Sequence, residues 1–341
     1  MTQPIIVSGT REILAYLPIR LGYTPTESLV VVAVRGDRRI GVVARMDLDD
    51  VTEVHAETLA QQVNSDHPTT VLAAIYTEDT DRAHAAIDRT AKAFGGYGLD
   101  VREAWQVTST DYRDLYDPTA KPEPVEDFKG TQVAAEAVAT GHVVRDSLAD
   151  LLPTPADAGA HAAARQAGET FRTDVGTGTD APTFGYAVWT LALTGVTSGP
   201  ETYGTLAEAL TDVPTRDALI VAMVPGTPED VIAQTLANTG GDAPGVGAAM
   251  RAIIDGAEGV RPGDEADKMR DLLTQVIAHA DSHQSAAAWT LWALIEWWHG
   301  NSATAREALT RAQASEPYRL AQLLSGAIAT GMPPGWVIRE R

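Results

Sequence analysis

The hydrophobic pattern of this chain changes at a proline-rich stretch about one third of the way along its 341 residues. Before that stretch, short runs of β-branched residues alternate with apolar stripes of helical spacing. Residues 117–128 contain three prolines and show no periodicity, which is typical of a loop or linker. After it, only helical patterns remain. The change predicts two parts of different fold class.

The first part, residues 1–117, is expected to be an α/β domain with its elements in the order α-β-β-α-β-α-β. A two-strand hairpin is predicted over residues 28–47, and further strands over residues 69–76 and 99–107. The helices are expected at residues 11–17, 51–64 and 80–94. Strands that alternate with helices imply at least one parallel crossover, so we expect a mixed sheet of about four strands covered by helices.

The second part is expected to be helical. Residues 118–130 are predicted to form a proline-rich linker, and residues 131–341 an all-α domain. Most of its helical stretches are bounded by Gly, Pro, Asp, Ser or Thr in capping positions. The fold class is therefore an α/β N-terminal domain followed by an all-α C-terminal region.

One pattern near the C-terminus is sharper than the others and covers residues 286–319. Its spacing resembles a tetratricopeptide repeat, which combines large apolar residues, small residues where helices cross, a glycine at the turn and a proline before the next helix. The large apolar residues are Trp289, Trp292 and Leu309, and the small ones are Ala293, Ala305 and Ala312. Gly300 is at the turn, and Pro317 ends the pattern. A plain helical hairpin packed on the rest of the helical region would show the same spacing. Both interpretations stay open.

The net charge and the short apolar runs of the chain argue against nucleic acid and membranes as partners. The chain has 26 Lys and Arg against 46 Asp and Glu, a net charge of −20. Such a surface repels phosphate backbones and anionic lipid, so we expect no nucleic-acid and no membrane partner. No apolar run approaches the roughly 20 residues that span a bilayer. With no signal-like N-terminus either, the chain is expected to be cytoplasmic.

Motifs for metals and cofactors are missing from the sequence. The chain has no Cys, which excludes disulfides and thiolate metal sites. His279 and His283 are four residues apart, a spacing that can hold zinc, but no Glu follows the first His. Histidine also suits the C-terminal end of a helix. No glycine-rich stretch stands in a nucleotide-binding context. We expect no metal and no cofactor.

Three polar residues are the candidate ligand site. Ser28 begins a strand, and Arg45 and Asp47 lie two residues apart on another strand, so their side chains share a face. With Thr77 they could form a small-molecule site, because α/β sheets bind ligands beyond the carboxyl ends of strands. The simpler interpretation is that Ser28 satisfies backbone groups, while Arg45 and Asp47 form an ion pair or cap the Leu48–Val51 turn into the next helix.

The whole chain resembles an actinobacterial family known as domain of unknown function 4192. The resemblance is carried by the segments Leu14–Pro18, Leu21–Pro25, Glu27–Val32, Arg45–Leu48, Ala134–Glu136 with Gly141, Arg216–Leu219 and Ala286–Pro334. Members often carry a Cys-Cys-Pro-like segment, where this chain has Tyr116-Asp117-Pro118. The family has no assigned activity, so the resemblance implies relatedness and no mechanism.

Two functions remain in competition. The first is an interaction or regulatory module that binds a protein partner through its helical region, beside Trp292 and Trp298. The second is an enzyme acting on a small molecule at the strand ends, around Ser28, Arg45 and Asp47. These tryptophans could equally be core residues, since Trp is largely buried on average.

Overall fold

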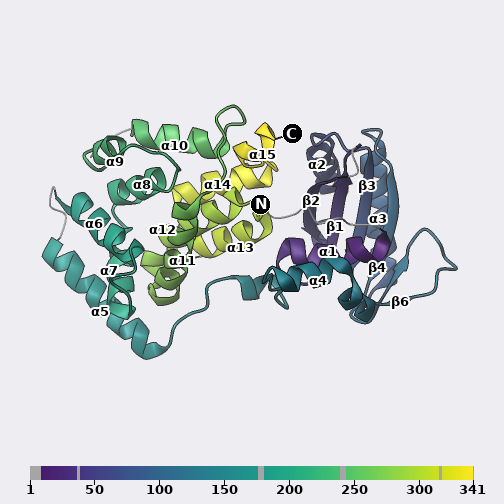
Figure 1. Ribbon diagram of the computed structural model, residues 1–341, viewed down its shortest axis with the longest axis horizontal. Coiled ribbons are helices and arrows are strands. Elements are labelled where there is room, and N and C mark those ends of the chain that lie inside the picture. The colour runs from purple at the N-terminus through teal and green to yellow at the C-terminus, as the bar shows by residue number, and fades with distance from the viewer. Residues whose placement is uncertain (1–8, 37–38, 176–179, 239–242, 315–316, 341) are drawn as a thin grey trace. The chain divides into compact units, whose positions relative to one another are not determined.

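The structure of the protein is a computed structural model that describes residues 9–36, 39–175, 180–238, 243–314 and 317–340. It divides into two compact units, Met1–Leu151 and Leu152–Arg341 (Figure 1). The division falls later than the stretch of residues 118–130, where the sequence placed a linker.

The N-terminal unit is built on a six-stranded mixed sheet with the strand order β2-β1-β3-β4-β5-β6. Its strands are β1 (Ser28–Val34), β2 (Ile40–Asp47), β3 (Thr70–Tyr76), β4 (Val101–Val107), β5 (Asp111–Asp114) and β6 (Glu123–Pro124). Among the described strand pairs, β3 and β4 are parallel and the others are antiparallel. The mixed sheet is confirmed. The sequence missed β5 and β6 because they are too short to show a period.

Helices cover both faces of this sheet, which explains why β1 is apolar at nearly every position. The helices are α1 (Thr10–Leu21), α2 (Glu53–Asn64) and α3 (Thr80–Gly95). Val30 and Val32 pack with Leu14 and Leu17 of α1 on one face. The alternate β1 residues, such as Val31, pack in a second core with residues of α2 and α3. A strand buried on both faces has a continuous apolar run rather than an alternating one.

The segment after β5 belongs to the N-terminal unit and is not a free linker. It forms β6, the 3-10 helix η2 (Val125–Gly130), α4 (Gln132–Ala139) and the 3-10 helix η3 (Leu148–Leu151). The carboxylate of Glu12 on α1 accepts hydrogen bonds from the backbone N–H groups of Gln132 (2.9 Å) and Val133 (3.1 Å). These bonds join α4 to α1, which it also contacts (Figure 1). The proline-rich segment is therefore part of the N-terminal unit.

The regular elements described in the C-terminal unit are all helices, as the sequence predicted. Its helices are α5 (Ala158–Val175), α6 (Ala181–Leu193), α7 (Pro200–Ala209), α8 (Val213–Ala222), α9 (Glu229–Leu236), α10 (Pro244–Ile254), α11 (Asp264–His279), α12 (Ser282–Trp298), α13 (Ser302–Ala312), α14 (Arg319–Ala329) and α15 (Gly335–Arg339). Over the described parts of the chain, no helix combines the length and the apolar character needed to cross a bilayer.

Helix α12 is central to this unit and contacts α7, α11, α13 and α14. It forms a hairpin with α13 across a turn in which Gly300 adopts a φ of 91°, a conformation that favours glycine. Ala293 and Ala305 are fully buried in the hairpin. The hairpin expected from the sequence is therefore present, and its assignment to the tetratricopeptide repeats stays a prediction.

Candidate functional site

Ser28, Arg45 and Asp47 meet at one end of the sheet, where Ser28 and Asp47 are paired across β1 and β2. The Arg45 Nε donates to Ser28 Oγ at 2.9 Å, and its Nη2 lies 2.6 Å from Asp47 Oδ1. The Ser28 hydroxyl donates to the Thr26 carbonyl oxygen at 2.6 Å. The predicted contact between Arg45 and Asp47 is confirmed. Ser28 is fully buried, so it does not present its hydroxyl at the surface.

Thr77 joins a different network, centred on a residue that the sequence did not single out. The Thr77 hydroxyl donates to Glu27 Oε1 at 2.8 Å, and Arg82 Nη1 donates to Glu27 Oε2 at 2.6 Å. Glu27 has a φ of 42°, an uncommon conformation for a residue with a side chain. Its carbonyl oxygen also accepts from the Leu48 N–H. These contacts hold the strained turn that leads into β1.

At the carboxyl end of β4, the polar side chains form hydrogen bonds with neighbouring groups of the protein. Gln106 is buried, and its Nε2 donates to the Thr77 carbonyl oxygen at 2.9 Å. Its Oε1 accepts from Arg113 Nε at 3.0 Å and from the Thr80 hydroxyl at 3.2 Å. These bonds fix the start of α3 to β4 and β5. At the edge where such sheets bind ligands, the polar groups of this protein bond to each other.

A polar cavity of about 520 Å³ lies between α2 and α3, next to the Glu27 network. It is lined by Leu48, Asp49, Val51, Thr52, Glu53, Arg82, Ala85, Ala86 and Arg89. Its charges are largely neutralised by neighbours: Arg82 Nη2 lies 2.6 Å from Asp49 Oδ1, and Lys92 Nζ lies 3.0 Å from Glu53 Oε1. Balanced charges give the cavity no strong preference for a cation or an anion.

The predicted partner surface beside Trp292 and Trp298 is not formed by these residues. They are 4% and 0% exposed, respectively. The Trp292 Nε1 donates to Thr274 Oγ1 at 3.1 Å, and the Trp298 Nε1 donates to the Val260 carbonyl oxygen at 2.8 Å. Both rings are core residues because α12 is surrounded by other helices. The placement of the partner site at these tryptophans is corrected accordingly.

The histidine pair is only partly described. The side chain of His283 lies outside the described residues. His279 Nδ1 lies 2.7 Å from the Gln275 carbonyl oxygen, and its ring packs on Tyr203 with centroids 4.9 Å apart. No group of three or more potential ligands suited to a metal ion is found among the side chains that the structure describes.

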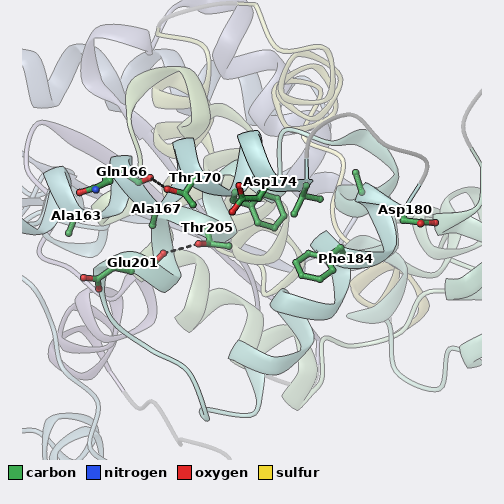
Figure 2. Close-up of a pocket in the computed structure, with 12 residues that line it drawn as sticks. Ala163, Gln166, Ala167, Thr170, Asp174, Asp180, Phe184, Glu201 and Thr205 are labelled. Atoms are coloured by element: carbon green, nitrogen blue, oxygen red, sulfur yellow. Dashed lines mark hydrogen bonds between the residues drawn. The ribbon is translucent and has the colours of Figure 1, made fainter.

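An open groove in the helical unit, lined by α5, α6 and α7, was not predicted from the sequence. Its volume is about 970 Å³. Figure 2 shows the side chains that line it. The lining residues are Ala163, Gln166, Ala167, Thr170, Phe171, Asp174, Val175, Asp180, Ala181, Phe184, Glu201 and Thr205. The α5 members recur every three or four residues, so they form one face of that helix.

The lining of this groove is apolar with an acidic border. Asp174, Asp180 and Glu201 are exposed, and the lining includes no Lys or Arg. None of these three carboxylates forms an ion pair with another residue in the described parts of the chain. Unpaired carboxylates beside apolar surface favour a ligand that is both basic and apolar.

Helix α6 forms one wall and contains no charged residue. Trp189 on its inner side is fully buried, yet Phe184 and Leu191 on another side are 53% and 46% exposed. The Phe184 ring packs against Phe171 of α5 with centroids 6.1 Å apart. The absence of charge over residues 181–193 was a signal in the sequence that pointed to this helix, although it did not reveal which side is exposed.

A protein family model described as Domain of unknown function (DUF4192) matches residues 11–239 and 245–335. No curated protein and no solved structure shows significant similarity to the chain. The family match extends over both units, and it includes the sheet-end network and the groove between α5, α6 and α7. This protein belongs to the DUF4192 family.

Proposed function

We propose that this protein is an interaction module that binds a protein partner through its helical unit, at the groove between α5, α6 and α7. The observation that carries the proposal is the uncharged helix α6, which exposes Phe184 and Leu191 to solvent. The exposed side of α6 also carries Thr183 and Thr190, so it is uncharged and largely apolar. A protein partner would cover the exposed Phe184 and Leu191 side chains, as partners cover exposed apolar patches on other interaction proteins.

The aromatic pair of the groove supports the same function. Phe184 lies at the groove (Figure 2). Its ring packs against the ring of Phe171, which comes from a different helix and also lines the groove. Aromatic side chains at the centre of an apolar patch supply large contact area and dominate many interfaces. Beside them, Ala163 and Ala167 have short side chains, so another chain can approach the backbone of α5 closely.

The alternative, an enzyme at the strand ends, has less support. Ser28, Arg45 and Asp47 bond to one another or to backbone groups. Glu27, Thr77 and Arg82 form a second network, which continues to Asp49 through Arg82. A catalytic group needs a reacting atom within hydrogen-bond reach, and each of these groups already forms at least one hydrogen bond or ion pair within the protein.

The test compares two truncations of exposed apolar residues in the same unit. Phe184→Ala removes a groove residue, and Leu323→Ala removes a residue of α14 that is 61% exposed. A partner is first identified from native lysate with the wild-type protein, then purified and titrated against each variant. We expect Phe184→Ala to weaken binding at least about tenfold and Leu323→Ala less than about twofold. Equal affinities for the two variants contradict the proposal.

A further inference from the structure

We infer that the groove between α5, α6 and α7 accepts one face of a short, basic, amphipathic helix of the partner. The inference rests on the proposed function and adds the shape and charge of the bound segment. It is carried by the helical spacing of the groove, by its unpaired carboxylates and by its aromatic pair.

The shape of the groove matches a helix. The lining residues of α5 run from Ala163 to Val175 along one face. At 1.5 Å per residue this face is about 18 Å long, a little more than three turns of a second helix. Helices that dock in grooves insert apolar side chains at positions i, i+3 or i+4, and i+7. Ala167, at the middle of the face, leaves room for such a side chain.

The charge of the groove selects a basic segment. Asp174, Asp180 and Glu201 border the apolar lining, and in the described chain none is neutralised by an ion pair. Lys or Arg side chains flanking the apolar face of a bound helix would lie near them and gain favourable electrostatic energy. A second copy of this chain is a less suitable occupant, since each copy carries a net charge of −20.

The apolar anchor is the Phe171 and Phe184 pair. Phe184 is 53% exposed although the rings are in contact, so one side of the pair stays open. A leucine or phenylalanine of the partner helix would cover the open side.

The probe is a synthetic Leu–Lys peptide of about 18 residues, with leucines on one helical face and lysines on the other. Two matched peptides separate shape from charge. One replaces every lysine with glutamate, and the other has the same composition in an order that spreads the leucines around the helix. Binding is measured by fluorescence anisotropy with the full-length protein, and circular dichroism confirms that each variant is folded.

Two triple variants with the same net charge test the carboxylates. The groove variant combines Asp174→Asn, Asp180→Asn and Glu201→Gln. The control variant neutralises three exposed carboxylates on α2, α3 and α9, through Glu57→Gln, Asp88→Asn and Asp230→Asn. We expect the groove variant to raise the Kd of the Leu–Lys peptide about tenfold and the control less than about twofold. Phe184→Ala should raise it about tenfold as well.

Several results would overturn the inference. Equal weakening by the two triple variants would mean attraction to net charge alone, and equal binding of the reordered peptide would mean that helical shape is irrelevant. A wild-type dimer in sedimentation that Phe184→Ala dissociates would identify a second copy as the occupant. If the natural partner depends on Phe184 but the Leu–Lys peptide does not bind, the inference fails and the proposed function stands. If the natural partner does not depend on Phe184, the proposed function itself fails.

Discussion

At the scale of single residues, the arginine at the end of the sheet shows how a candidate site can be a structural feature. Arg45 is largely buried, with 13% of its side chain exposed, and it connects Ser28 of β1 to Asp47 of β2. Its removal would leave the fully buried Ser28 oxygen without its donor. A buried oxygen that keeps only one of its two hydrogen bonds, here the bond that Ser28 donates to the Thr26 carbonyl oxygen, carries a desolvation penalty.

Arg45→Ala is therefore expected to lower the free energy of unfolding by about 1–2 kcal/mol. The measurement is urea denaturation followed by circular dichroism. Arg102→Ala on β4 is the matched control, because Arg102 is exposed and should tolerate the change. Unchanged stability of the Arg45 variant, together with lost binding of an identified small ligand, would instead favour the enzyme alternative.

A buried glutamate in the helical unit gives a pH-dependent prediction. Burial raises the pKa of Glu296 above its ordinary value of 4.5, and the Asn301 hydrogen bond and Arg270 offset only part of this effect. The folded protein thus holds this proton more tightly than the unfolded chain does. The contribution of Glu296 to stability is largest at low pH and declines as pH rises from about 4.5 through the raised pKa.

Glu296→Gln removes this titration and keeps an oxygen that can accept the Asn301 hydrogen bond at 2.8 Å. We expect the Tm of the variant to be close to that of the wild type at acid pH and to exceed it increasingly as the pH rises through that interval. Thermal unfolding at a series of pH values measures the difference. A constant difference over the whole range would contradict the prediction.

At the scale of helices, the α12–α13 hairpin is tightly packed at one alanine. Ala305 is fully buried, whereas Ala303 at the start of the same helix is partly exposed. Ala305→Leu should lower the free energy of unfolding by about 1–3 kcal/mol, because added methylene groups overpack a filled core. Ala303→Leu should change it by less than about 0.5 kcal/mol. Chemical denaturation distinguishes the two, and equal effects would show that the buried face of α13 is assigned incorrectly.

The contact between α5 and α7 requires a residue without a side chain at Gly204. A Cβ atom at Gly204 would lie 1.8 Å from the Ala164 carbonyl oxygen, so the two helix backbones would have to move apart. Since these helices also line the groove, Gly204→Ala should weaken partner binding as well as stability.

We expect Gly204→Ala to lower the free energy of unfolding by at least about 2 kcal/mol. Gly326 on α14 serves as its control, because a Cβ atom there meets no other atom within 4 Å. Gly326→Ala should raise stability by about 0.5–1 kcal/mol, the ordinary gain in helix propensity. Calorimetric unfolding of both variants is the measurement, and a stable Gly204 variant would show that the helix crossing is less close.

At the scale of the whole molecule, the dominant feature is the acidic excess of both parts of the chain, with a total net charge of −20. Repulsion among like charges destabilises a compact state, and salt screens that repulsion. The Tm should therefore rise between low and moderate sodium chloride concentrations. Differential scanning fluorimetry at several salt concentrations measures the change, and a falling Tm would mean that the ion pairs contribute more than the repulsion.

The sequence determined the fold class because hydrophobic periodicity is a local property. The apolar run of β1 and the helical stripes after residue 130 are visible in the chain itself. The contact between Arg45 and Asp47 was predictable for the same reason, since residues two apart on a strand share a face.

Tertiary structure decided which apolar residues are exposed and where the first unit ends. Nothing local distinguishes Trp298, which is fully buried, from Phe184, which is 53% exposed. The difference arises because α12 is covered by helices from other parts of the chain, while α6 is left partly open. Likewise, α4 belongs to the first unit because Glu12, 120 residues before Gln132, bonds to its first turn. Burial depends on contacts between distant segments, and those contacts form only when the chain has folded.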